Sequence, residues 1–362
     1  MLHSTHAVVY CHRATSIGLR HVCVSETASL LCPTAMVRSR AQPALSNAAL
    51  LYAMLLHATL LHHAQYCCDV AGKGTLLGIL LRAGVRVRRY LSIEIDENAR
   101  RVCRINYGST YGGLLARDAL RFFGDARALT IGDLKALDCW PVDLLMGATP
   151  CNDLSGCNAD PDGVHGEESS LIFDFAALYF ELKANNGAHP LAMLFENVRP
   201  PRKHHQREML GVLGLPPLDS EAAVFEAARR RRWLISNMMF EHVPSNTPNK
   251  LMQSVLNPHA VALSDKGSCI ITSTLSGAGE TVATAKAHSS RNRGRELVLC
   301  APHSTEVRGL LIPEMCRALG QPFNEVDSAA GSEGGKANLL GRSLAEGQIR
   351  HALQSFIAAC RQ

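Results

Sequence analysis

The 362-residue sequence lacks the two patterns that most directly indicate a secreted or membrane-spanning chain. Its 13 cysteines include no Cys-x-x-Cys pair and no regular spacing, which argues against a disulfide framework and against a zinc module. Residues 48–61 are almost wholly apolar, but this run is shorter than the ~20 residues that a membrane-spanning helix needs. We therefore expect reduced thiols inside a cell, a core or interfacial helix at 48–61, and no membrane span.

Acidic residues are almost absent from residues 1–66, where Glu26 is the one carboxylate among four arginines. An acid-poor amino terminus that contains Ser and Arg is typical of an organelle transit peptide. A disordered arm and a mispredicted gene start are the alternatives. We treat residues 1–66 as a divergent segment that is separate from the rest of the chain.

The chain as a whole has the composition of a soluble globular protein, and the part after residue 66 has the pattern of an α/β domain. Hydrophobic residues make up 47% and charged residues 19%, and the net charge of +5 is compatible with a nucleic-acid partner. Residues 66–70 read as a strand, followed by a turn with Gly72 and Gly74 and a helix through Leu81. A second strand, 89–95, contains Glu94 at its end. This arrangement is typical of nucleoside or dinucleotide binding, because glycines allow close backbone approach and the acid accepts hydrogen bonds from ribose.

Two further apolar strands end in residues with reactive side chains. Residues 142–146 stop at Gly147, and Pro150 stiffens the loop immediately before Cys151. Residues 191–198 form the second run and contain Glu196 near the end. Burying a carboxylate there costs folding free energy unless the group is paired or serves a function. Because the carboxyl ends of strands form the sites of α/β sheets, both residues are candidates for chemistry.

Four consecutive arginines, residues 229–232, follow two alanines and precede Trp233. Such a run is usually a solvated basic face or a nuclear-import signal. The alternative is that individual arginines of the run act in a functional site of the protein.

The loop Gly147-Ala-Thr-Pro-Cys-Asn-Asp-Leu-Ser155 resembles the nucleophile loop of the DNA cytosine-5 methyltransferases, most closely that of the animal de novo branch. Residues 166–174 are also similar to the plant domains-rearranged methyltransferases. Glu196-Asn-Val resembles a further family motif and follows Cys151 by 45 positions, and residues 230–232 resemble its Arg-x-Arg motif. The resemblance covers residues 67–362 in the animal motif order.

This resemblance implies a Rossmann-like α/β fold that binds S-adenosyl-L-methionine, with a small target-recognition insert. It implies a catalytic core at 67–240, the insert at 241–305 and a return to the core at 306–362. Cys151 would be the nucleophile, assisted by Glu196, Arg230 and Arg232, and no metal would be needed. Double-stranded DNA would be the partner, contacted by arginines of the insert: Arg291, Arg293 and Arg295. The cofactor-binding residues would be Asp69, Gly72, Gly74, Glu94, Asp125, Leu171, Arg342 and Ser343.

For some of these residues, and for the function itself, the sequence leaves an alternative open. Asp125 would read the adenine amino group in the family, but an aspartate at this position also suits a turn cap. Asp69 stands one place earlier than the family's first motif requires, and Leu344 replaces the tryptophan of de novo enzymes. A catalytically inactive DNA- or partner-binding homologue and a tRNA cytosine-5 methyltransferase are therefore the competing functions. A homo-oligomer or a methyltransferase-like partner subunit would suit the family, as would the nucleus, or an organelle if residues 1–66 are a transit peptide.

Overall fold

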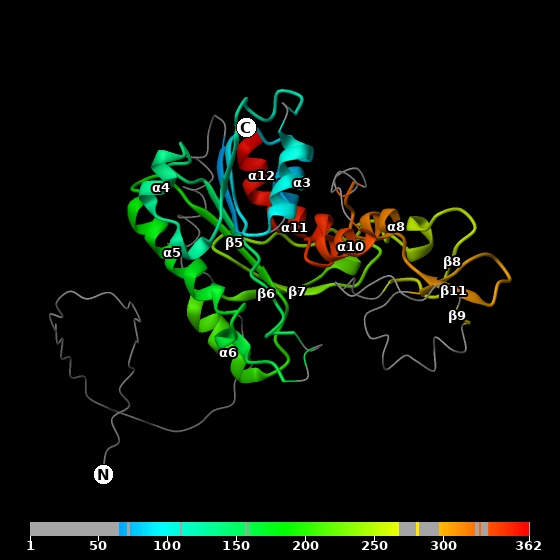
Figure 1. Cartoon of the computed structure of the whole chain (residues 1–362). Helices are drawn as coiled ribbons and strands as arrows, with labels where there is room; N and C mark the ends of the chain where they lie inside the picture. The colour runs from blue at the N-terminus through cyan, green and yellow to red at the C-terminus, as the bar shows by residue number, and fades with distance from the viewer. Residues whose placement is uncertain are drawn as a thin grey trace, which may run out of the picture. The chain divides into compact units, whose positions relative to one another are not determined.

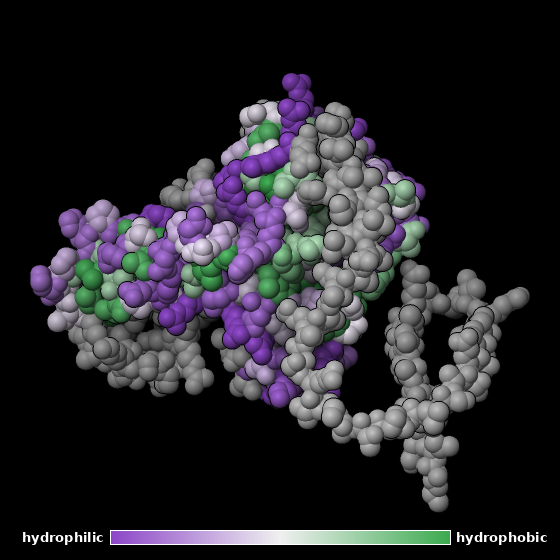
Figure 2. All heavy atoms as spheres, turned by 180° about the vertical axis from the view of Figure 1, so that it is seen from behind, coloured by the Kyte–Doolittle hydropathy of each residue, from purple (hydrophilic) through white to green (hydrophobic). Residues whose placement is uncertain are grey.

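The computed structural model describes residues 65–70, 73–108, 111–155, 158, 160–267, 280–281, 297–322, 326 and 332–361. The predicted helix at 48–61, Gly72 and the three insert arginines, Arg291, Arg293 and Arg295, lie outside the described residues. Among the helices that are described, none is long and apolar enough to cross a membrane. On the face drawn in Figure 2, hydrophilic side chains are interspersed with small apolar groups.

Seven strands form the central sheet, in the order β3-β2-β1-β4-β5-β7-β6. Figure 1 labels β5, β6 and β7 of this sheet. Neighbouring strands from β3 to β5 run parallel, whereas β7 is antiparallel to both β5 and β6. The strand order reverses between β1 and β4, which is where open α/β sheets bind their ligands. The Rossmann-like fold predicted from the sequence is therefore confirmed. The strands are β1 (Gln65–Val70), β2 (Val87–Ile93), β3 (Leu120–Phe123), β4 (Leu144–Gly147), β5 (Ala192–Asn197), β6 (Pro217–Glu221) and β7 (Arg231–Ser236).

Helices cover both faces of this sheet, and the strands divide their side chains between two cores because successive residues point to opposite faces. Leu144, Met146 and Leu194 pack in one cluster with the first group of helices, whereas Leu145 and Met193 pack in the other. The first group contains α2 (Thr75–Arg82), α3 (Glu97–Tyr107), α11 (Glu346–Ala352) and α12 (Gln354–Arg361). The second contains α4 (Ile131–Ala136), α5 (Leu171–Asn185) and α6 (Lys203–Leu213).

The carboxyl-terminal segment packs beside the first helix of the described chain. Leu344, Ile349 and Phe356 share a buried cluster with the leucines of α2. Arg82 of α2 makes a two-pronged contact with Glu346, with nitrogen–oxygen distances of 2.9 and 2.7 Å. Two helices, α11 and α12, form the end of this segment and meet at Leu353.

A second, antiparallel sheet has the order β8-β10-β11-β9. Its strands are short: β8 (Val261–Ala262), β9 (Glu280–Thr281), β10 (Leu297–Leu299) and β11 (Glu306–Gly309). Such strands cannot bury a core alone. Val298 of β10 packs in a third cluster with Ala228, Met315 and Leu340, so the sheet shares its core with α8 (Ile312–Ala318) and α10 (Glu333–Gly341). Residues of the predicted insert and of the predicted return thus form one packed body.

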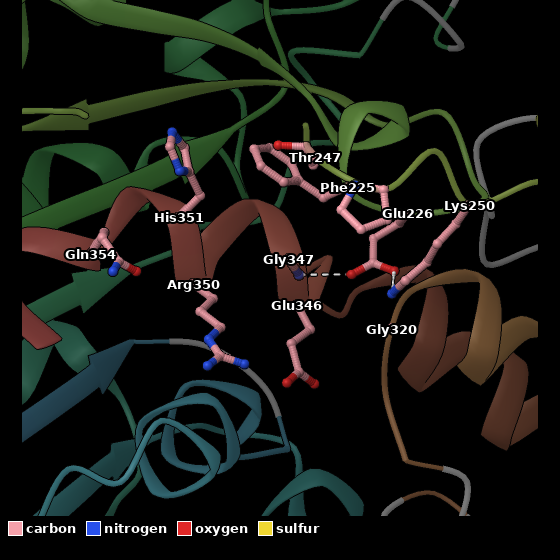
Figure 3. A pocket seen from close by; sticks show the side chains of 11 residues that line it. Phe225, Glu226, Thr247, Lys250, Gly320, Glu346, Gly347, Arg350, His351 and Gln354 are labelled. Atoms are coloured by element: carbon pink, nitrogen blue, oxygen red, sulfur yellow. Dashed lines mark hydrogen bonds and ion pairs between the residues drawn. The ribbon is translucent and has the colours of Figure 1, made fainter. Parts of the chain in front are cut away.

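A buried carboxylate joins this body to the central domain. Glu226 is only 2% exposed, and its oxygens accept hydrogen bonds from Gly347 N at 2.9 Å and Lys250 Nζ at 2.8 Å (Figure 3). A Cβ at Gly320 or Gly347 would lie 2.2 or 2.7 Å from Glu226 Oε1, so both positions require glycine. An open cleft of about 320 Å³ lies beside this junction.

Candidate active site

Cys151 lies on a short turn that is anchored on both sides. Leu154 N donates to Cys151 O at 3.1 Å, and the Leu154 side chain is fully buried in the core. Ser169 Oγ donates to Pro150 O at 3.3 Å. The thiol-bearing residue itself is half-buried. The predicted nucleophile is thus held by its backbone while its side chain is partly accessible.

Asn197 fixes the loop that leads to Cys151. Its Nδ2 donates to both the carbonyl oxygen and Oγ1 of Thr149, each at 3.1 Å. This contact arises because β4 and β5 are parallel neighbours, with Gly147 beside Phe195, so the chain beyond β4 lies next to the end of β5. The Glu196-Asn-Val motif contains Asn197, but the sequence alone gives this residue no role. An amide side chain directly after the acid at the end of a strand is the feature of the sequence that could have indicated a role for Asn197.

Glu196 and Arg232 form a buried ion pair beside this loop. Glu196 Oε1 lies 2.8 Å from Arg232 Nε, and the two side chains are 7% and 8% exposed. The pair forms because β7 is antiparallel to β5, which brings the start of β7 to the end of β5. Within the described part of the chain, no donor makes a hydrogen bond of normal geometry to Oε1. Oε1 is thus paired with Arg232 by charge, and the further lone pairs of a carboxylate could accept a hydrogen bond from a ligand.

The four-arginine run is not a continuous solvated face. Arg229 and Arg231 are exposed, whereas Arg230 and Arg232 are buried, because side chains alternate along the chain entering β7. The exposed Arg231 pairs with Asp219 at 2.7 and 2.6 Å. The buried Arg230 donates from Nη1 to Gly341 O at 3.2 Å. The two arginines named by the resemblance are thus the two that point inward.

Glu94 and Asp125 follow the carboxyl ends of neighbouring strands, β2 and β3. The backbone of Glu94 donates to Phe123 O at 3.0 Å, and one carboxylate oxygen of Glu94 accepts from Asp96 N at 2.9 Å. Asp125 caps a short 3₁₀ turn by accepting from Arg127 N at 3.0 Å. Hydrogen bonding to the Arg127 side chain lowers the pKa of Asp125 from its ordinary value. The turn-capping role is therefore present, and Asp125 is an ionised acceptor at neutral pH.

The start of α2 provides the close approach expected of a nucleoside site. Gly74 precedes the helix in the left-handed region, with φ of 81°, and a Cβ there would lie 2.7 Å from Cys103 Sγ. Asp69 lies on β1 beside Ser92 of β2 and Met146 of β4. A glycine turn and two strand-end carboxylates, Glu94 and Asp125, thus share one edge of the sheet. This arrangement fits the ribose hydroxyls and the amino group of an adenosine cofactor.

The remaining predicted cofactor residues lie at helix ends. Leu171 is the first residue of α5, and Arg342 is the exposed C-cap of α10. Ser343 is buried, and its Oγ donates to Leu339 O at 2.6 Å within the same helical segment. Among the described residues, no group of three His, Cys, Asp or Glu side chains is arranged to hold a metal ion.

The fold and this edge define the class of an S-adenosylmethionine-dependent methyltransferase. Residues 71–213 match the family model of the C-5 cytosine-specific DNA methylases. The rice (Oryza sativa subsp. japonica) protein DNA (cytosine-5)-methyltransferase DRM2 is 30% identical over 112 residues, which cover 30% of this chain and 18% of the rice protein. Residues 71–213 are therefore similar to the C-5 cytosine-specific DNA methylases, as the motifs predicted, and the cofactor of this family is S-adenosyl-L-methionine.

Solved structures share the fold over most of the chain. The Dnmt2 methyltransferase of S. pombe has a TM-score of 0.51 at 15% identity, covering 82% of this chain and 98% of that one. A Spodoptera frugiperda DNMT2 mutant gives 0.53 at 13% identity, covering 82% and 100%. The Entamoeba histolytica methyltransferase EhMeth gives 0.56 at 11% identity, covering 83% and 99%. At these identities, the comparison concerns the fold alone.

Proposed function

We propose that this chain is a DNA (cytosine-5-)-methyltransferase that acts on a cytosine flipped out of duplex DNA, through a covalent adduct with Cys151. The observation that carries the proposal is the convergence of three elements at one sheet edge. The Cys151 loop is bound by Asn197, and the adjacent Glu196 is held by Arg232.

The thiol supplies the step that cytosine cannot make alone. Carbon 5 of cytosine is too weak a nucleophile to attack a methyl sulfonium directly. When the Cys151 thiolate adds to carbon 6, the electron pair of the 5,6 double bond becomes available at carbon 5. Because a free thiol has a pKa near ~8.5, a fraction of it is already ionised at neutral pH. A half-buried cysteine on a fixed turn supports this role for Cys151.

Glu196 would hold the base and offset the charge that develops in its ring. A carboxyl group can hydrogen-bond ring nitrogen 3 and the exocyclic amino group of cytosine together. Arg232 fixes this carboxyl in place, which limits the reorganisation needed during the reaction. Since a stacked base cannot enter a buried pocket, the nucleotide must first leave the duplex.

S-adenosylmethionine, when bound, supplies an electrophilic methyl group, and Gly74, Glu94 and Asp125 are the residues that would hold its nucleoside. Once carbon 5 carries the methyl group, a base removes the proton at that carbon. The electrons of the broken C–H bond restore the 5,6 double bond and expel the Cys151 thiolate. The protein thus ends the cycle unchanged.

A methyl-transfer assay that compares duplex DNA with tRNA tests this proposal. DNA is the expected substrate because the Pro150–Ser155 loop resembles the DNA branch and the rice relative bears that activity in its name. We expect radiolabelled methyl groups on duplex DNA with wild type and none with Cys151→Ala. Methylation of tRNA alone would contradict the DNA assignment. Cofactor binding without transfer to either substrate would instead favour the inactive, DNA- or partner-binding homologue.

A further inference from the structure

The far arm of the Cys151 loop folds back onto the first turn of α6. Arg202, the N-cap of α6, donates from Nη1 to Pro161 O at 3.3 Å and from Nη2 to Asp160 Oδ1 at 3.1 Å. Val164, further along the same arm, is buried in the core. This arm is thus held against a helix that begins just beyond Glu196 and Asn197.

Gly163 of the arm faces the imidazole of His205 on α6. His205 is 5% exposed, and Gly163 has φ of 72°, which disfavours any side chain. A Cβ on Gly163 would lie 2.4 Å from Cδ2 and 2.6 Å from Nε2 of the imidazole. Burial lowers the pKa of His205 from its ordinary value, so the ring is neutral near pH 7. The loop backbone therefore lies directly against an uncharged ring.

A short series of contacts connects this point to the nucleophile. Gly163 N donates to Asp153 O at 2.9 Å, and Asp153 Oδ2 accepts from Ser169 N at 3.2 Å. Asp153 belongs to the turn that the hydrogen bond from Leu154 N to Cys151 O closes. A Cβ on Gly166 would lie 2.2 Å from Asp153 Cγ, so this side of the turn has no spare space. A shift of Gly163 would be transmitted to Cys151 over two hydrogen-bonded steps.

We propose that His205 is a positioning residue for the Cys151 thiol, acting as a steric stop for the Gly163 segment. The inference rests on the proposed function, because it assumes that Cys151 is the nucleophile. The imidazole of His205 would act through its shape and not through a hydrogen bond. Among the described residues, Nδ1 of the ring has no hydrogen-bond partner. No motif of the sequence contained this histidine.

The test compares His205→Ala and His205→Phe with Gly211→Ala, an exposed position of the same helix at which an added Cβ meets nothing within 4 Å. The readout is the rate at which each protein is covalently trapped on duplex DNA that contains 5-fluorocytosine, with S-adenosylmethionine present. His205→Ala should slow trapping by about 10- to 100-fold, since a displacement near 1 Å has effects of this size. His205→Phe should stay within about threefold of wild type because it keeps a ring in place, and Gly211→Ala should match wild type. Cofactor affinity, measured by calorimetry, should be the same in all four proteins, which a general loss of structure would not allow.

A second pair of variants covers the case in which His205→Ala does not fold. Gly163→Ala should slow trapping because its methyl group meets the ring. The double variant Gly163→Ala/His205→Ala should be trapped faster than the two single effects added together predict. Additive effects, or a His205→Ala protein that traps at the wild-type rate, would overturn the inference. If wild type binds cofactor and DNA but is never trapped, the proposed function fails instead.

Discussion

Glu196 Oε1 and Arg232 Nε lie 2.8 Å apart in an ion pair whose two side chains are both more than nine-tenths buried. The pair joins the end of β5 to the start of β7 and stands beside the loop that Asn197 binds. Its charges compensate each other in a place from which water is largely excluded. Loss of either partner of this ion pair should therefore both destabilise the fold and disturb the position of the Glu196 carboxylate.

Arg232→Ala should destabilise the protein strongly, because it leaves the Glu196 carboxylate buried without its partner. The expected loss is about 3–5 kcal/mol of unfolding free energy, measured by urea denaturation. Arg231→Ala is the matched control, since Arg231 is adjacent in sequence but exposed on the opposite face, where ion pairs contribute little. Equal shifts of the urea midpoint in the two variants would contradict the assignment of Arg232 to the buried pair.

Asp125→Ala should weaken S-adenosylmethionine binding. Loss of a polar partner to the adenine amino group corresponds to about 1–3 kcal/mol in calorimetry. Arg127→Ala removes the present partner of this carboxylate and is the control. It should leave cofactor affinity within a few-fold of wild type. An Asp125→Ala protein with unchanged affinity would show that the residue only caps its turn.

Alkylation at pH 8 should distinguish Cys151 from two other cysteines. Burial raises the pKa of Cys139 to about 11 and of Cys360 to about 12. A thiol with a pKa of 11 is only roughly 0.1% thiolate at pH 8, and raising the pH toward 11 would be needed to change this. We expect brief iodoacetamide treatment, followed by peptide mass spectrometry, to label Cys151 first and to abolish methyl transfer. Earlier labelling of Cys139 would contradict this order.

Neutralising Arg291, Arg293 and Arg295 tests the predicted insert, although these residues lie outside the described part of the chain. If the arginines contact phosphates, the triple Gln variant should bind all duplex sequences more weakly. The slope of log affinity against log salt should fall by about one unit per lost contact. If one of them reads guanine, its single variant should relax sequence preference instead. Binding that responds to neither change would remove these arginines from the interface.

The strands that carry the site could be predicted because each is a short apolar run that stops at a polar or glycine residue. Cys151 and Glu196 were assigned to strand ends on this basis, and β4 and β5 end within a few residues of the expected places. The resemblance implied that Arg230 and Arg232 act in the site, and the structure shows that both side chains point inward. The period of two in the strand supplies the physical reason.

Long-range contacts could not be predicted in the same way. Asn197 and Thr149 are 48 positions apart, and Glu226 and Gly347 are 121 apart. Such pairs depend on strand order and packing, which local pattern does not specify. The third core, which unites β10 with α8 and α10, has the same origin, because no single segment buries enough apolar surface to be recognised alone.

Covalent trapping tests the central claim most directly, because fluorine at carbon 5 blocks the elimination that normally releases the enzyme. Wild type should form a complex with 5-fluorocytosine duplex DNA that survives denaturation and requires S-adenosylmethionine. Cys151→Ser should form none, since a hydroxyl is a far poorer nucleophile near neutral pH. Glu196→Gln should slow methyl transfer by about 10²–10⁴-fold while DNA binding persists, because phosphate contacts carry most of the affinity. A wild-type protein that binds both DNA and cofactor yet is never trapped would contradict the role of Cys151.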